Sequence, residues 1–184
     1  MKEKLLDVAE DLVVERGLNA VSFQHLADAV GIQKPSVFHH FKSKEALSLA
    51  LVERCQISYG QMYAEIIHGE GDAPAKLRAL GEVFYNSLVH GRVCMASVLS
   101  SEVASLTGAA RAELKITIQS IVERFALVFE QGVDEGSLSY QGDSKDAARA
   151  YLAMLQGLQM IARTADDPEI LRQGVESHIG TISI

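Results

Sequence analysis

A basic segment without acidic residues stands out in this acidic chain. The 184 residues carry 17 Lys and Arg against 24 Asp and Glu, a net charge of -7, yet residues 33–44 hold Lys34, Lys42 and Lys44 and no acid. Salt screens charges over about 10 Å at 0.1 M, so the local charge governs contact with a phosphate more than the distant total does. Two interpretations compete: an ordinary surface turn, or a short helix built to touch an anion.

The segment is predicted to lie on a short helix. Pro35 fits the first turn of a helix over residues 33–40, because the amides there lack intrahelical partners. Ser43 is placed to cap the next helix, which we expect to continue to residue 68. The basic residues therefore fall on this short helix and its exit.

Two further helices precede it. Apolar residues at three- and four-residue spacing predict a helix over residues 2–16, ended by Gly17. Ser22 is placed to cap a second helix that ends at Gly31. Two short helices separated by a turn are typical of a helix-turn-helix, whose second helix enters the major groove of DNA. This favours the anion-binding interpretation.

The remainder of the chain also reads as helices, so the predicted fold class is all-α. Helical patterns cover, in order, residues 73–90, a short helix between 91 and 108, residues 109–135, residues 144–165, and a last helix from 168 to about 178. We predict an N-terminal three-helix helix-turn-helix domain over residues 1–47. A helical domain for ligand binding and dimerisation is predicted over residues 48–184.

Composition excludes several classes of protein. No apolar run approaches the roughly 18 residues of a membrane span, and two cysteines are too few for a disulfide framework. The six histidines show no metal spacing, and no catalytic constellation stands out. We therefore expect a cytoplasmic protein that neither spans a membrane nor binds a metal or cofactor, and that is not an enzyme.

The stretch SFQHLADAVGIQKPSVFHHFKSKEAL, residues 22–47, resembles the TetR family of transcriptional regulators. The matching positions are Ala27, Gly31, Ile32, Phe41, Lys44, Glu45 and Leu47. Two positions depart from the family pattern: Phe38 stands where a Tyr is usual, and Gln33 takes the usual Ser or Thr capping position. The resemblance implies a DNA-binding head and a C-terminal domain that binds a small molecule.

Candidate DNA contacts lie on and around the third helix. Lys34 could donate to guanine and Gln33 to adenine, while Lys44 at a helix N-terminus suits a phosphate. Val37 has two interpretations, apolar contact with a thymine methyl or packing in the core. The full predicted set is Ser22, Gln33, Lys34, Ser36, Val37, His39, His40 and Lys44.

Candidate ligand contacts lie on the middle helices, if these surround a cavity. Cys94 opens the short helix that resembles a pocket-lining segment of the family, and it is either a sensing thiol or a buried structural cysteine. The predicted set is Tyr59, Met62, Tyr63, Phe84, Leu88, Cys94, Met95, Val98 and Glu102.

The functional hypothesis is a repressor that a small molecule releases from a palindromic DNA operator. We expect a homodimer formed through residues 109–165, because one three-helix head touches too few base pairs for a specific site. The alternative is a helical small-molecule-binding protein or enzyme without DNA binding.

Overall fold

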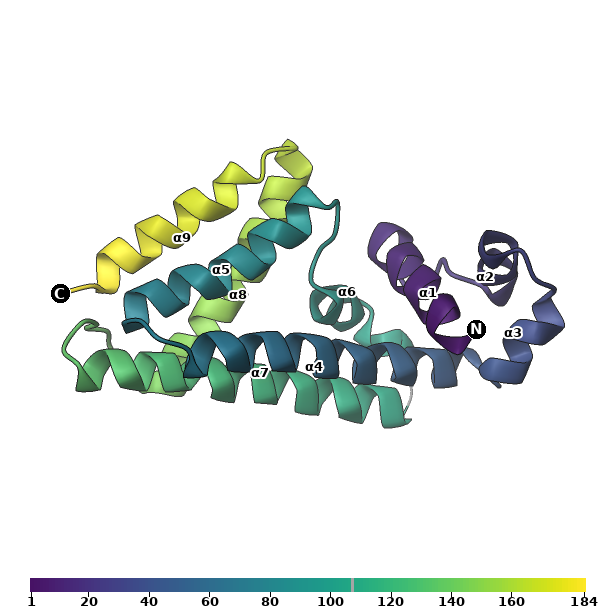
Figure 1. The fold of residues 1–184 in the computed structure, drawn as a ribbon, viewed down its shortest axis with the longest axis horizontal. Coiled ribbons are helices and arrows are strands. Elements are labelled where there is room, and N and C mark those ends of the chain that lie inside the picture. The colour runs from purple at the N-terminus through teal and green to yellow at the C-terminus, as the bar shows by residue number, and fades with distance from the viewer. Residues whose placement is uncertain (107) are drawn as a thin grey trace. The chain divides into compact units, whose positions relative to one another are not determined.

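The computed structural model describes residues 1–106 and 108–184, and these residues form helices joined by short loops (Figure 1). The helices are α1 Lys2–Arg16, α2 Phe23–Val30, α3 Lys34–His40, α4 Lys44–His68, α5 Ala73–Val89, α6 Met95–Ser101, the 3-10 helix η1 Val103–Ser105, α7 Gly108–Asp134, α8 Ser144–Ala165 and α9 Glu169–Ile182. Across these residues, β structure is limited to one isolated bridge between Leu138 and Ser183. The all-α prediction is confirmed.

The predicted helix boundaries agree closely with the observed ones. The helices at residues 2–16 and 144–165 begin and end as predicted, and α7 is displaced by one residue. The last helix continues to Ile182, four residues beyond the prediction. In the part of the chain that the structure describes, none of the helices combines the length and the hydropathy needed to cross a lipid bilayer.

Packing divides the chain into two compact units. The N-terminal unit comprises Met1–Ser58 and Cys94–Ile118, and the C-terminal unit comprises Tyr59–Val93 and Gln119–Ile184. The sequence predicted two contiguous domains with a boundary at residue 47. The observed units are discontinuous, because the chain returns after residue 93 and α6 packs against α1. The helices α4 and α7 each contribute residues to both units.

Local capping explains the short helices of the N-terminal unit. Ser22 Oγ accepts a hydrogen bond from the His25 amide at 3.2 Å, and the Ser22 amide donates to His25 Nδ1 at 3.3 Å. This reciprocal capping box satisfies two amides at the start of α2. Gly31 ends the helix with φ +77°, a left-handed conformation that suits glycine. Ser43 Oγ caps α4 by accepting from the Ala46 amide at 3.1 Å.

A small apolar core lies beneath these caps. Each fully buried Leu, Val or Phe side chain contributes roughly 1.5–3 kcal/mol relative to exposure. The buried set in this part of the unit is Leu5, Leu6, Ala9, Val13, Val14, Leu18, Val21, Phe23, Leu26, Ala27, Val37, Phe41, Leu47 and Leu51. The core fixes α1 and α2 together and α2 against α3.

In the C-terminal unit, α5, α8 and α9 pack against one another (Figure 1). Tyr151 on α8 is fully buried, and its hydroxyl donates to the Leu77 carbonyl of α5 at 2.6 Å. The Tyr151 ring also neighbours Phe125, Phe129 and His178, at centroid distances of 6.2, 6.0 and 5.6 Å. Aromatic side chains from α7, α8 and α9 thus meet at the centre of this unit.

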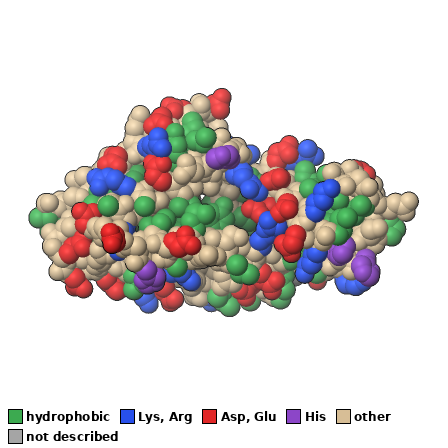
Figure 2. Space-filling view, viewed as in Figure 1, with side chains coloured by type: hydrophobic (Ala, Val, Ile, Leu, Met, Phe, Trp, Pro, Cys, Tyr) green, Lys and Arg blue, Asp and Glu red, His purple; other side chains and the backbone are tan. Residues whose placement is uncertain are grey.

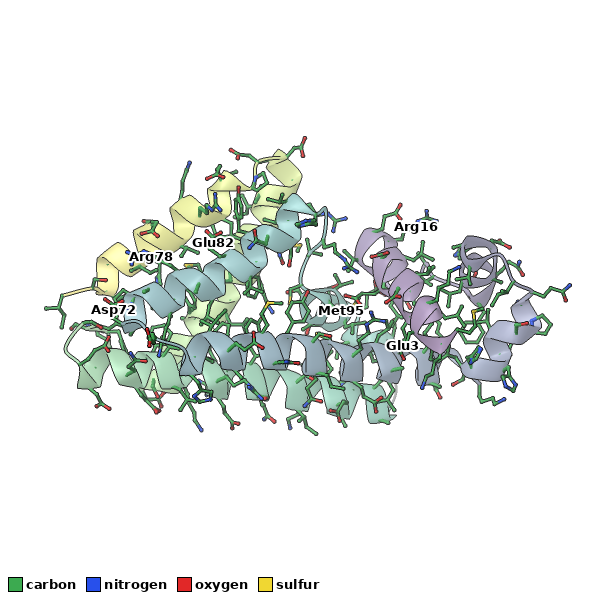
Figure 3. The ribbon with its side chains drawn as sticks, viewed as in Figure 1. Glu3, Arg16, Asp72, Arg78, Glu82 and Met95 are labelled. Carbon is green, nitrogen blue, oxygen red and sulfur yellow. The ribbon has the colours of Figure 1, made fainter. Side chains whose placement is uncertain are left out.

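Polar side chains also join the helices of the C-terminal unit. Buried Lys76 on α5 donates to the Ile67 carbonyl near the end of α4 and to Gln131 Oε1 of α7, both at 2.8 Å. Arg172 on α9 forms two hydrogen bonds to Glu82 on α5, at 2.7 and 2.8 Å. Arg78 and Glu82 extend from α5 on the side of α9 (Figure 3). These bonds connect segments far apart in the sequence.

Candidate nucleic-acid interface

The helix α3 presents a polar and basic outer face. Lys34, Ser36 and His39 are exposed along it, and Lys42 is exposed just beyond its end. Figure 2 shows lysine and histidine side chains gathered over this part of the N-terminal unit. The structure thus brings most of the predicted DNA contacts to one short helix and its exit. Such a face can bind phosphates through its ammonium groups and read base edges through its polar tips.

Val37 does not belong to this face. Its side chain is 0% exposed and packs in the core of the unit. A fully buried methyl group cannot reach a thymine, so the predicted base contact at Val37 is wrong and its alternative, core packing, is correct. The seven-residue α3 must bury one side against α2, and Val37 provides that side.

The remaining predicted contacts surround α3. Gln33 is exposed and precedes α3 without a side-chain capping bond. The ring of half-buried His40 lies edge-on to that of His39, at a centroid distance of 5.4 Å. Ser22 is exposed, but its hydroxyl already accepts the amide of His25 as the cap of α2.

Phe38 and Lys2 were absent from the predicted site. Phe38 is 44% exposed, and its ring packs edge-on against Phe23 at 4.7 Å. An aromatic ring on the outer face offers apolar area beside the basic residues. Lys2 places its ammonium 5.8 Å from the centre of the Phe41 ring, next to the exit of α3. Only the position of Phe38 in the family pattern could have drawn attention to it, and no local signal marks Lys2.

Lys44 is the first residue of α4 and is exposed. Its ammonium donates to the backbone carbonyl of Asn19, in the loop between α1 and α2, at 3.1 Å. This bond holds the lysine at a helix N-terminus, where the helix dipole and free amides favour a phosphate. The predicted phosphate role of Lys44 is therefore compatible with its position.

The predicted ligand contacts fall into both units. In the C-terminal unit, Tyr63 and Phe84 are buried, and Tyr59 and Leu88 are half-buried. The Tyr63 ring lies 6.0 Å from that of Tyr59. Met62 is 42% exposed and lies outside the packed core of this unit, unlike its neighbour Tyr63. Both residues stay predicted ligand contacts, and they differ in that Tyr63 is buried whereas Met62 is exposed.

In the N-terminal unit, Cys94 and Met95 are buried at the start of α6, and Val98 is half-buried. Figure 3 labels Met95 on this helix. Cys55 on α4 is buried as well, and neither cysteine forms a disulfide. Burial, with the neighbouring Cys94 thiol and the Glu10 carboxylate, raises the pKa of Cys55 to about 12. The Cys55 thiol therefore stays protonated and unreactive near neutral pH, as expected of a structural cysteine.

Glu102, predicted as a ligand contact, is bonded instead to the loop between α1 and α2. Its Oε2 accepts the backbone amide of Asn19 at 2.8 Å. One of the two carboxylate oxygens of Glu102 is thus engaged in a hydrogen bond within the N-terminal unit. The role of Glu102 as a ligand contact stays a prediction, and in this structure its carboxylate faces the α1–α2 loop.

Few groups in the described residues suggest other chemistry. No cluster of three or more His, Cys, Asp or Glu side chains that could hold a metal ion occurs within residues 1–106 and 108–184. A recess beside α5 and α9, lined in part by Arg78, Glu82 and Arg172, has a volume of ≈ 20 Å³. Such a volume admits a water molecule but no organic ligand.

Comparisons with known proteins agree with this geometry. Residues 5–51 match the family described as bacterial regulatory proteins, tetR family, and residues 73–177 match the tetracyclin repressor-like C-terminal domain. The HTH-type transcriptional repressor NemR of Escherichia coli K12 is 26% identical over 98% of this chain and 92% of its own. The HTH-type transcriptional repressor KstR2 of Rhodococcus jostii RHA1 is 32% identical over 80% of this chain and 72% of its own.

Solved structures share the fold over the whole chain. A TetR-family transcriptional regulator from Agrobacterium tumefaciens superposes with a TM-score of 0.94 at 24% identity, covering 100% of this chain and 97% of the other. The two family matches cover both the α3 region and most of the remaining helices. The chain therefore belongs to the TetR family of bacterial regulatory proteins.

Proposed function

We propose that this TetR-family regulator is a repressor that binds a palindromic operator as a homodimer and leaves it when a small molecule binds. The observation that carries the proposal is the outer face of α3, where Lys34, Ser36 and His39 are exposed above the buried Val37. The printed names of two relatives, NemR and KstR2, describe them as transcriptional repressors. The exposed face of α3 and the names of these two relatives thus both support DNA binding.

Assembly is proposed to follow from exposed apolar side chains on the long helices. In the C-terminal unit, Leu127 of α7 and Met160 and Ile161 of α8 are 46%, 40% and 57% exposed. Gly157 on α8 has open space where a Cβ would stand, so a second helix can approach there closely. Pairing two such helices from each of two chains forms a four-helix bundle with two-fold symmetry. Two heads would then read two half-sites of a palindrome.

The ligand proposal rests on the buried aromatic surface of the C-terminal unit. Tyr63 and Phe84 are 1% and 2% exposed, and Tyr63 packs edge-on against Phe125 at 5.1 Å. Apolar walls with aromatic rings are typical of small-molecule sites in proteins. We infer an apolar or aromatic ligand, held beside Tyr63, as the class that fits this surface.

The test is DNA binding by point variants, on an operator obtained by selection from randomised duplexes. Lys44→Ala should weaken binding to all sequences alike and lower the slope of log affinity against log salt by about one unit. Lys34→Ala and Gln33→Ala should change which bases are selected, at about 1–3 kcal/mol for each lost bidentate contact. Lys115→Ala, which removes an exposed lysine of α7, is the matched control and should change neither.

Failure of the proposal has a clear form. A wild-type protein that binds no duplex DNA at low salt would overturn it. A light-scattering mass of one chain at micromolar concentration, with tight operator binding retained, would overturn the homodimer.

A further inference from the structure

Asn19, in the loop between α1 and α2, has its backbone and side-chain groups bonded to three residues in two separate segments. Its amide donates to Glu102 Oε2 at 2.8 Å, and its side-chain amide donates to Ser105 Oγ at 2.9 Å. Its carbonyl accepts the ammonium of Lys44 at 3.1 Å. All four residues belong to the N-terminal unit. One loop residue therefore joins the segment after α6 to the first residue of α4.

The backbone of Gly17 lies close to the Glu102 carboxylate. Its φ is +82°, in the left-handed region that favours glycine. Independently, Glu102 Oε1 occupies the space that a Cβ at residue 17 would need. The left-handed backbone disfavours a side chain here, and a side chain at residue 17 would also have to displace the flexible end of Glu102 from the loop.

The acidic partner comes directly after α6. Glu102 ends this helix, and α6 carries Met95 and Val98, two of the predicted ligand contacts. The 3-10 helix that follows provides Ser105. Because α6 also packs against α1, a displacement of α6 must be transmitted to the α1–α2 loop or break its bonds.

We propose that Asn19 is a relay through which α6 controls the position of Lys44, and so its contact with a DNA phosphate. The inference rests on the proposed function and names a route for its regulation. Glu102 and Ser105 are positioning residues: they hold the loop, and the Asn19 carbonyl holds the ammonium. A free lysine side chain loses much rotamer entropy when it is fixed, and an anchored one loses less on binding. A shift of α6 that withdraws Glu102 would release this anchor.

The test is a double-mutant cycle on DNA affinity, which needs no knowledge of the ligand. The probe is a fluorescently labelled random-sequence duplex of about 30 base pairs, titrated by anisotropy at several salt concentrations. The variants are Glu102→Ala, Lys44→Ala and the combination of both. Glu102→Gln retains a carbonyl oxygen for the Asn19 amide but removes the charge, which separates the hydrogen bond from simple charge repulsion of DNA.

The relay predicts effects that do not add. Glu102→Ala should weaken binding about threefold relative to Glu102→Gln and lower the salt slope by part of the unit that Lys44→Ala removes. In the Lys44→Ala background, Glu102→Ala and Glu102→Gln should have the same affinity, because the lysine that they position is gone. A loss of stability alone would lower the active fraction of protein without changing the slope.

Two controls guard the result. Glu53→Ala removes an exposed carboxylate of α4 and should leave the salt slope unchanged. Ser105→Ala removes the acceptor of the Asn19 side chain without altering charge, and should weaken binding in the same direction as Glu102→Ala, by a smaller factor. Thermal unfolding of each variant confirms that it is folded at the temperature of the titration.

The outcomes separate the relay from the function on which it rests. If wild type binds the duplex and the Glu102→Ala loss is the same with and without Lys44, the relay is overturned and DNA binding stands. If wild type binds no DNA at all, both fall.

Discussion

Both units of this molecule combine local caps with long-range hydrogen bonds, but they differ in where the long-range bonds lie. Those of Asn19 in the N-terminal unit are exposed, whereas those of Tyr151 and Lys76 in the C-terminal unit are buried. In the N-terminal unit, the helix ends are fixed by neighbours in the sequence, as Ser22 and His25 show at α2. In the C-terminal unit, the bonds that join helices connect distant residues, such as Tyr151 to Leu77 and Arg172 to Glu82. In the small N-terminal unit, short-range caps and a few buried apolar residues define the helices. The outer face of α3 is therefore available to contact DNA.

Buried polar side chains occur in both units, but Ser48 and Thr117 of the N-terminal unit bond within their own helices, whereas those of the C-terminal unit bond to other helices. Lys76, Gln159 and the Tyr151 hydroxyl are buried in the C-terminal unit, and each donates to a backbone carbonyl. A buried polar group costs free energy unless it is hydrogen-bonded, so each of these groups specifies one arrangement of its helices.

Tyr151→Ala should have the largest effect. Removing a fully buried aromatic side chain is expected to lower the free energy of unfolding by about 3–5 kcal/mol. Tyr151→Phe keeps the ring, and loss of its hydrogen bond to Leu77 should cost about 1 kcal/mol. Urea unfolding followed by circular dichroism measures both. Equal effects of the two variants would contradict the packing role of the ring.

Alkylation of Cys55 tests whether packing in the N-terminal unit keeps this thiol inaccessible to reagents. Its pKa, raised to about 12 by burial, predicts iodoacetamide labelling at pH 8 about a thousandfold slower in native than in urea-unfolded protein. The rate should rise with pH as the thiolate forms. Peptide mass spectrometry quantifies each cysteine separately. Labelling of native Cys55 at the unfolded rate would show that the thiol is accessible and that the packing around it opens.

Ser22→Ala tests the local caps. Loss of the capping box at α2 should lower the free energy of unfolding by about 1 kcal/mol, within a usual range of 0.5–2 kcal/mol. The matched control is Ser100→Ala at an exposed serine of α6, expected to change stability by less than about 0.5 kcal/mol. Indistinguishable effects in urea unfolding would mean that the cap is not what fixes α2.

The smallest effect is expected at the ion pair between α5 and α9. The hydrogen bonds from Arg172 lower the pKa of Glu82, so the charged carboxylate favours the folded state. That contribution is present above the ordinary pKa of a glutamate and is lost as the pH falls through the lowered value. Since both side chains are about 40% exposed, with relative areas of 43% and 41%, solvent limits the pair to about 0.5 kcal/mol.

Glu82→Gln should therefore destabilise the protein slightly at pH 7 and have no effect at a pH where Glu82 is already protonated. Urea unfolding at both pH values, at low salt, measures the difference. A destabilisation that persists unchanged in acid would assign the effect of Glu82 to packing.

Sequence patterns predicted the helices well because their causes are local. Ser22, Pro35, Ser43 and Asp72 mark helix starts, and Gly31 marks a stop, through bonds within a few residues. The same patterns placed Lys34 on α3, Lys42 just beyond its end and Lys44 at the start of α4, where the structure has them. They could not decide between the two interpretations of Val37, because a seven-residue helix has too few turns to define its apolar side.

The bonding partners of the predicted ligand residues were harder to predict, and the reason is geometric. The pattern of α6 did not reveal that Glu102 bonds to Asn19, 83 residues away in the sequence. Similarly, nothing around residue 54 indicates that Arg54 pairs with Asp7 and Glu10 of α1. Pairings of this kind depend on how helices pack, which hydropathy spacing does not encode.

By itself, then, the sequence determined the helical fold class, the helix ends and the basic face of α3, since each depends on contacts within one or two helical turns. The tertiary structure alone decided which side of α3 is buried, that α6 returns to the N-terminal unit, and that Gly17, Asn19, Lys44 and Glu102 meet. The physical reason is that packing selects among the many ways in which amphipathic helices can bury their apolar faces. Only that selection brings distant polar side chains within hydrogen-bonding distance.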